Sequence, residues 1–264
     1  MAKLDAIDNI NAPLDEPIVR KIGVADLKQS LMEGLDDFKA MPTHAFFIVL
    51  IYPVLGLFLA RYSFGYKVLP LLFPLMSGFA LLGPFAALGL YELSRQRERG
   101  EVFSWTAASD VLKGPSLGSI VALGVWLLAI FLMWMGAAQA IYKSAFGNHV
   151  PQSLSMFLQD IFLTRQGWAV IIVGNLAGLV FSAVVLAISV VSFPMLVDHH
   201  VSLGTAIQTS IRAVMANPVP MALWALIVAA GLFIGFIPLF FGLAVTLPIL
   251  GHATWHLYRK LVAQ

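Results

Sequence analysis

The sequence predicts an all-α integral membrane protein, with six transmembrane helices arranged as three hairpins and short amphipathic interfacial helices on the cytoplasmic side. Hydrophobic residues make up 59% of the 264 positions and charged residues only 11%, with a mean hydropathy of +0.87. Soluble domains are about half apolar and about a quarter charged. Apolar runs of spanning length recur along the chain, and short segments of helical periodicity separate them.

The first 42 residues are predicted to form a cytoplasmic tail and an amphipathic helix that precede a six-helix transmembrane domain at 43–264. Apolar side chains recur at helical spacing in residues 24–41, at Val24, Leu27, Leu31, Leu35 and Phe38. The charged residues of this segment take the other faces. Such a helix can lie in the membrane interface or pack on the protein, and the pattern is compatible with either partner.

Six charge-free stretches approach the ~20 residues that cross a bilayer. They are residues 44–60, 68–90, 116–141, 168–193, 219–236 and 239–256. The last two belong to one uncharged run that is about twice as long as a bilayer is thick, so the chain must turn within it. Pro238 is the expected turn.

The distribution of Lys and Arg predicts that both termini are cytoplasmic. Most of the basic residues flank the ends of the spans that lie inside when the N-terminus is inside, and only Arg61, Lys67, Lys143 and Arg165 fall outside. Basic residues in short loops are retained on the cytoplasmic side. The three hairpins then close on the outer side at residues 61–67, at residues 143–167 and at Pro238.

Each of the two cytoplasmic connections has the same order of parts: a proline, a polar stretch, a short amphipathic helix and a second proline. The first connection contains a helix near residues 104–113. The second connection contains a helix at 203–216, between Pro194 and Pro218. One face of this helix carries Leu203, Ile207, Ile211, Val214 and Met215. About fourteen residues are too few to span, so the helix is expected to lie along the inner membrane surface.

Two histidines of the last span are candidates for a cofactor site. His252 and His256 are four residues apart and share a helical face. Two axial ligands approach a haem from opposite sides, so a second helix would have to supply the partner, and His44 is the candidate. The alternative is that these histidines hydrogen-bond near Trp255, Tyr258 and lipid headgroups. No cofactor is predicted, and haem b is the alternative.

Three further polar groups are candidates for a functional site. Asp198, His199 and His200 are consecutive and could bind a divalent ion, but adjacent helical residues diverge by about 100°, which favours a surface loop. Asn175 is a polar group deep in a span and would line a channel if one existed. A mixed-sign run at 92–101 is either a dock for headgroups or partners, or a topology determinant with local ion pairs.

Several stretches resemble a bacterial inner-membrane family catalogued as domain of unknown function 2189. They are residues 83–101 (GPFAALGLYELSRQRERGE), residues 189–228 and the ending GHATWHLYR at 251–259. The likeness extends over nearly the whole chain. It implies location in the bacterial cytoplasmic membrane. Some members carry a cytochrome c oxidase label, but the resemblance implies no established activity.

Missing motifs restrict the function more than the motifs that are present. The sequence has no cysteine, no HExxH, no GxSxG, no P-loop and no GxGxxG, so we expect no enzymatic activity. A net charge of +2 argues against nucleic acid. The favoured function is a non-catalytic accessory, assembly or structural partner of a larger membrane complex, such as a respiratory complex. The alternatives are a passive channel or small-molecule permease, and a haem-binding redox subunit associated with a cytochrome oxidase.

Overall fold

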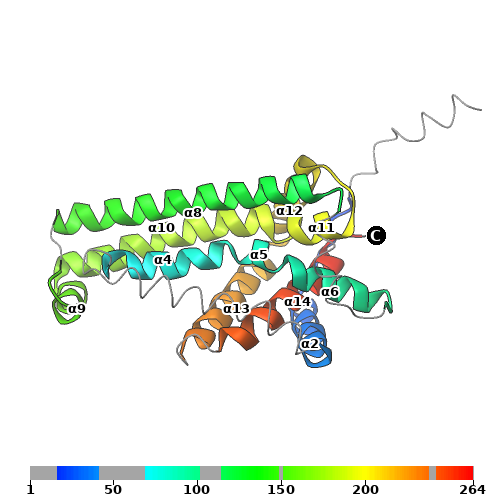
Figure 1. The fold of residues 1–264 in the computed structure, drawn as a ribbon, viewed down its shortest axis with the longest axis horizontal. Helices are drawn as coiled ribbons and strands as arrows, with labels where there is room; N and C mark the ends of the chain where they lie inside the picture. The colour runs from blue at the N-terminus through cyan, green and yellow to red at the C-terminus, as the bar shows by residue number, and fades with distance from the viewer. Residues whose placement is uncertain (1–16, 42–68, 102–113, 149–150, 238–241, 264) are drawn as a thin grey trace, which may run out of the picture.

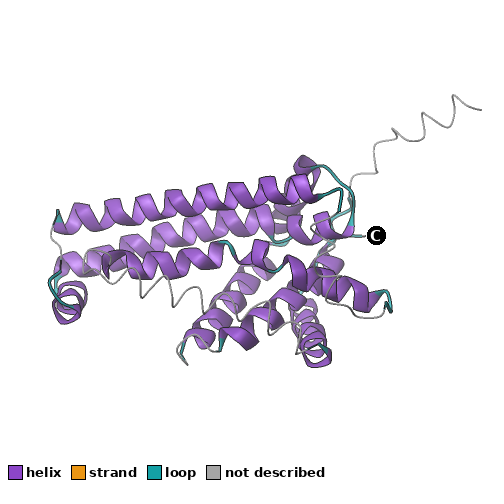
Figure 2. Cartoon of the chain, viewed as in Figure 1, coloured by secondary structure: helices purple, strands orange, loops and turns teal. Residues whose placement is uncertain are grey.

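All regular elements in the described part of the chain are helices (Figure 2). The structure is a computed structural model and describes residues 17–41, 69–101, 114–148, 151–237 and 242–263. In chain order the helices are α2 (Val24–Ala40), α4 (Leu69–Leu81), α5 (Gly83–Ala86), α6 (Leu88–Glu98), α8 (Leu117–Phe146), α9 (Leu154–Leu163), α10 (Arg165–Ser189), α11 (Ser192–Asp198), α12 (Leu203–Ala216), α13 (Pro218–Phe236) and α14 (Leu243–Leu261).

Three stretches within the described ranges are helical, long and apolar enough to cross a membrane. They are α8, the 34 residues of α10 and α11 together, and α13. The predicted spans at 116–141, 168–193 and 219–236 are thereby confirmed as membrane-spanning candidates. With 30 residues, α8 is about 45 Å long and exceeds the ~30 Å of the hydrocarbon core.

The other three predicted spans are not confirmed as such. Residues 44–60 lie outside the described residues, as do the expected turns at 61–67 and Pro238 and the helix near 104–113. Of the predicted span at 68–90, the described residues 69–90 form α4, α5 and the start of α6, because single non-helical residues interrupt the run at Leu82 and Ala87. The last predicted span corresponds to α14, which ends in a polar half.

The helices α4, α8 and α10 run side by side, and α13 and α14 lie obliquely to them (Figure 1). Trp134 of α8 joins all three parallel helices. Its indole Nε1 donates to the carbonyl oxygen of Pro74 in α4 at 2.9 Å, and its ring lies 5.6 Å from that of Phe181 in α10. A buried indole N–H needs such a partner, so this contact sets the position of α4 on the hairpin of α8 and α10.

The amphipathic helix α2 packs along α14, so the protein covers one of its faces, while Val24, Met32 and Leu35 stay exposed. Its buried face carries Leu27, Ser30, Gly34 and Asp37. At Gly34 the two backbones approach so closely that an added Cβ would lie 2.5 Å from the amide nitrogen of Ala253. Only glycine permits this separation, so the N-terminal helix is fitted to one particular turn of α14.

The helix predicted at 203–216 is confirmed as α12, but the face that contacts the protein is not the apolar one. Ala206, Thr209, Ser210 and Ala213 are buried, whereas Met215 is 74% exposed. The hydroxyl of Ser210 accepts a hydrogen bond at 3.2 Å from the amide of Val191, between α10 and α11. Small residues therefore form the buried centre of the contact, Leu203, Ile207 and Val214 pack at its margin, and Ile211 and Met215 project outward.

The two ends of the described chain meet at this joint. Val19 and Val262 form an antiparallel β-bridge. Asn217, which is buried between α12 and α13, accepts from the amide of Ile22 at 2.8 Å and donates to the carbonyl of Arg20 at 3.0 Å. The segment that precedes α2 is thus held by α14 on one side and by Asn217 on the other.

Substitution of Gly34 by alanine is expected to separate α2 from α14. The new methyl group would overlap the backbone at Ala253, and overpacking of this kind costs about 1–3 kcal/mol. The thermal unfolding midpoint in detergent should fall. Gly136→Ala in α8 is the matched control, since no atom lies within 4 Å of its added Cβ. Equal midpoints for the two variants would contradict the close packing of α2 on α14.

Candidate functional site

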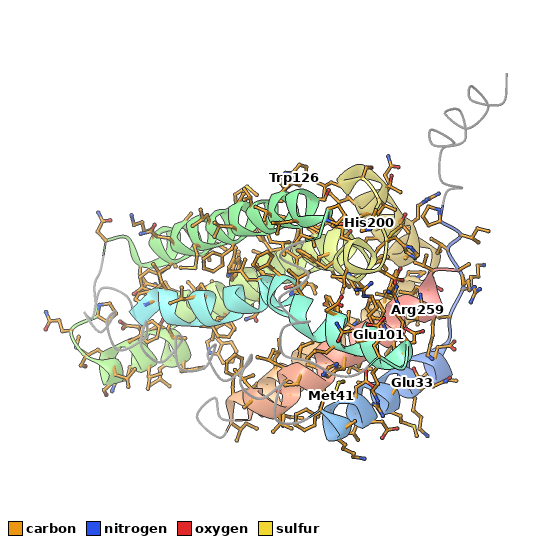
Figure 3. All side chains as sticks on the ribbon, turned by 45° about the vertical axis from the view of Figure 1, so that its right-hand side comes forward. Glu33, Met41, Glu101, Trp126, His200 and Arg259 are labelled. Atoms are coloured by element: carbon orange, nitrogen blue, oxygen red, sulfur yellow. The ribbon has the colours of Figure 1, made fainter. Side chains whose placement is uncertain are left out.

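Most of the charged contacts between helices gather at one end of the molecule, where α2, α6, α11 and α14 meet. We call this set the polar cluster; it comprises Glu33, Asp37, Ser94, Arg97, Glu98, Asp198, His252, Trp255, His256, Tyr258, Arg259 and Lys260. Figure 3 shows Glu33 and Arg259 at this end, whereas Trp126 lies on the outer side of α8. The C-terminal half of α14 supplies half of the members.

Two rows of side chains with helical spacing face each other between α2 and α14. Glu33 and Asp37 are one turn apart on α2, and His256 and Lys260 are one turn apart on α14. The Nε2 atom of His256 lies 2.8 Å from Oδ2 of Asp37, and Nζ of Lys260 lies 3.0 Å from Oε2 of Glu33. The two acidic residues of α2 therefore face His256 and Lys260 of α14, and these two pairs set the register of the contact.

Asp37 is the centre of the cluster and is only 4% exposed. Its carboxylate accepts from Ser94 at 2.6 Å and from Arg97 at 2.5 Å, in addition to the contact with His256. Burial by itself would raise the pKa of Asp37. The hydrogen bonds from His256 and Ser94 outweigh burial, so the pKa of Asp37 lies below its ordinary value and the group is ionised at neutral pH.

His252 is fully buried and bonds to the same centre through Ser94. Its Nδ1 lies 2.7 Å from Oγ of Ser94. Because an ionised carboxylate only accepts, Ser94 donates its single hydrogen to Asp37 and accepts from Nδ1–H of His252. This chain of bonds assigns the tautomer of His252 and connects α14, α6 and α2 in one network.

Elsewhere in the polar cluster, Asp198 of α11 accepts two hydrogen bonds on one oxygen. The hydroxyl of Tyr258 and Nη1 of Arg259 each lie 3.0 Å from its Oδ2. Burial and the charge of Asp198 raise the pKa of Tyr258 above its ordinary value, so the phenol stays protonated and donates. Arg259 also reaches Glu98 of α6 at 2.9 Å, and Trp255 donates to the same carboxylate. The guanidinium therefore bridges α11 and α6.

The geometry of the cluster does not match a nucleophilic triad, although Ser, His and Asp are all present. In a triad the histidine lies between the serine and the carboxylate. Here Ser94 bonds directly to both Asp37 and His252, and all three side chains are buried. The arrangement neutralises buried charge and joins helices.

The structure places His252 and His256 against other helices, and their hydrogen bonds do not go to Trp255 or Tyr258. Their hydrogen-bond partners are Ser94 of α6 and Asp37 of α2. His44 lies outside the described residues, so the haem alternative stays a prediction.

The three consecutive residues Asp198, His199 and His200 do not converge. Asp198 turns inward to Tyr258 and Arg259, and the exposed His199 lies 3.2 Å from it. His200 instead faces Ser116, at 3.5 Å. In the part of the chain that the structure describes, no group of three or more His, Asp or Glu side chains is placed to hold a metal ion.

Asn175 lies on an exposed face of α10 and bonds to its own helix, where its amide donates to the carbonyl of Ile171 at 2.7 Å. It therefore does not line a path between helices of the described part. The permease alternative stays a prediction without support from this residue.

Reasoning from the sequence missed the most important member, Asp37, and its partner Ser94. The available signal was the pair of acidic residues one turn apart on α2, which matches the spacing of the basic residues on α14. The mixed-sign run at 92–101 also makes contacts with other helices, in addition to the local ion pairs that were predicted. Arg95 pairs locally with Glu92, but Arg97 and Glu98 bind α2 and α14.

Comparison with known proteins gives a match to one family model. Residues 72–198 match a family described as predicted integral membrane protein (DUF2189). This is the family that the sequence resembles, and the matched region covers α8, α10 and most of α4 to α6. Searches of curated proteins and of solved structures give no match.

Replacing Asp37 by asparagine is expected to loosen the polar cluster. The change removes the charge that faces Arg97 and His256, and leaving buried polar groups unpaired costs about 1–3 kcal/mol each. The unfolding midpoint should fall, and amide hydrogen exchange should rise in α2. Asp36→Asn is the control, because Asp36 is 65% exposed and exposed ion pairs contribute about 0–1 kcal/mol. Equal effects of the two variants would show that Asp37 is not the centre.

Proposed function

We propose a function from the geometry of this chain, because the description of the family that residues 72–198 match, predicted integral membrane protein (DUF2189), states only that its members are membrane proteins. The protein is a non-catalytic accessory subunit of the bacterial cytoplasmic membrane. It packs its membrane helices against a larger membrane complex and supports the assembly or stability of that complex.

This proposal rests on the hydrogen bonds that the candidate polar groups make within the protein. Asp198, His252 and His256 are occupied in bonds between helices, and Asn175 bonds to its own helix. The membrane-spanning helices instead present large apolar side chains on their outer faces, including Trp126, Leu176 and Leu226. Outward apolar faces suit lipid or the helices of another membrane protein.

We further propose that the end with the polar cluster faces the cytoplasm. Basic residues are numerous there, at Arg20, Lys21, Lys28, Arg95, Arg97, Arg99, Arg259 and Lys260. The opposite end of α8 and α10 carries Lys143 and Arg165. The retention of Lys and Arg on the cytoplasmic side supports this orientation, and the bridge between Val19 and Val262 keeps both ends of the described chain on one side.

Site-specific photo-crosslinking in native membranes tests the accessory function. A benzophenone amino acid at Leu176 or Leu226, both exposed, should give an adduct of one reproducible mass that contains a second membrane protein. The same group at the fully buried Leu127 is the control and should give none. Adducts with lipid alone, or only with copies of this chain, would contradict the proposal.

A further inference from the structure

The hairpin of α8 and α10 carries a helix at its far end that was predicted only as a loop. This helix, α9, spans Leu154–Leu163 and lies across the end of the hairpin, away from the polar cluster (Figure 1). None of its residues is buried, and Leu154, Met156, Leu158, Phe162 and Leu163 are large, apolar and exposed. Exposed apolar side chains at this density need a partner.

The apolar residues form a stripe along α9. At about 100° per residue, Leu154, Leu158 and Phe162 fall within about 80° on the helical wheel, and Ser155 and Gln159 begin the polar face. Phe157 and Ile161 extend the stripe toward the protein, where both are half-buried. One stripe of α9 is therefore apolar and is left uncovered by the described residues, while Met156 and Leu163 lie on the other side of the helix.

The corner between α9 and α10 is held by several bonds, so the position of the stripe is fixed. Thr164 donates to the carbonyl of Asp160 at 2.5 Å and accepts from the amide of Gly167 at 3.0 Å. Trp168 donates from its indole to the carbonyl of Phe162 at 3.0 Å. An added Cβ at Gly167 would overlap the carbonyl oxygens of Asp160 and Ile161. The last carbonyls of α9 are thus bound by the first turn of α10.

Three features point to lipid as the partner of this stripe. The exposed apolar surface of α10 begins with Trp168 and Ile172, directly beside the corner, so the stripe continues a surface that a bilayer covers. Trp168 is an aromatic residue that favours the interface. Lys143 and Arg165, at the adjoining ends of α8 and α10, supply positive charge at headgroup level.

The length of the hairpin agrees with this position. The 25 residues of α10 are about 37 Å long, whereas the hydrocarbon core is about 30 Å thick. The surplus length allows the first turns of α10, which α9 crosses, to lie in the headgroup region. An amphipathic helix at this depth lies in the plane of the membrane surface with its apolar face toward the acyl chains.

We propose that α9 is an interfacial helix, whose stripe of Leu154, Leu158 and Phe162 inserts into the leaflet opposite the polar cluster. With α12 at the other end, the protein then contacts both surfaces of one bilayer. The contact limits how far the hairpin of α8 and α10 can tilt or slide through the membrane. This proposal does not depend on the accessory function, since it concerns lipid alone.

The sequence contains no cysteine, so single-cysteine labelling of the whole chain tests the proposal directly. The variants are Leu158→Cys and Phe162→Cys on the stripe, with Gln159→Cys as the neighbouring control, and all three positions are exposed. Each is labelled with an environment-sensitive fluorophore and reconstituted in vesicles of phosphatidylcholine and phosphatidylglycerol. Some vesicles contain lipid with a nitroxide quencher on its acyl chain. Leu154→Cys provides a second stripe position if a variant fails to reconstitute.

The labels at 158 and 162 should show blue-shifted emission and at least twofold stronger quenching by the nitroxide lipid than the label at 159. Weak and equal quenching at all three positions, with emission typical of water, would overturn the proposal. Blue-shifted emission at 158 and 162 without quenching by the lipid would also overturn it, because a second copy of the chain would then cover the stripe. Disulfide-linked dimers of Phe162→Cys would identify that case.

Discussion

The buried carboxylate of Asp37, which α2 places against the C-terminal half of α14, is the constraint on which the contacts among α2, α6 and α14 depend. An ionised carboxylate such as Asp37 is stable in the interior only when hydrogen bonds and opposite charges replace its water. Ser94, Arg97 and His256 supply them, and they come from α6 and α14. Since no single helix can satisfy Asp37, the position of α2 is coupled to the positions of the other two.

The need to pair buried charge also explains why the polar and the apolar parts of the molecule are separated. Polar side chains are concentrated where α2, α6, α11 and α14 meet, and the shafts of α8, α10 and α13 are left with apolar surfaces. The joint at α10 to α12 follows the same principle on a smaller scale. Serine hydroxyls at positions 192 and 210 bind backbone groups where the helix breaks, and small residues allow α12 to lie close. A rigid polar end and apolar shafts suit a protein that is held by lipid and by helix contacts.

Local patterns in the sequence predicted individual helices well. The length of the apolar runs predicted α8, α10 and α13, and helical periodicity predicted α2 and α12. Both signals depend only on neighbours along the chain. The contacts of Asp37 could not be predicted in this way, since Ser94 and His256 are 57 and 219 positions away and their approach depends on packing. α9 was missed because ten residues are too few for a span and the stretch was expected to be a loop. The pairing of His256 with Asp37 was not predicted because the two residues are 219 positions apart in the sequence.

A charge exchange between α2 and α14 tests the central claim most directly. Glu33 and Lys260 lie 3.0 Å apart across the contact, although 227 positions separate them in the sequence. Glu33→Lys and Lys260→Glu should each lower the thermal unfolding midpoint, because each places like charges together. If α2 packs on α14 in this register, the double variant should recover at least half of the summed loss. Losses that simply add in the double variant would contradict the account.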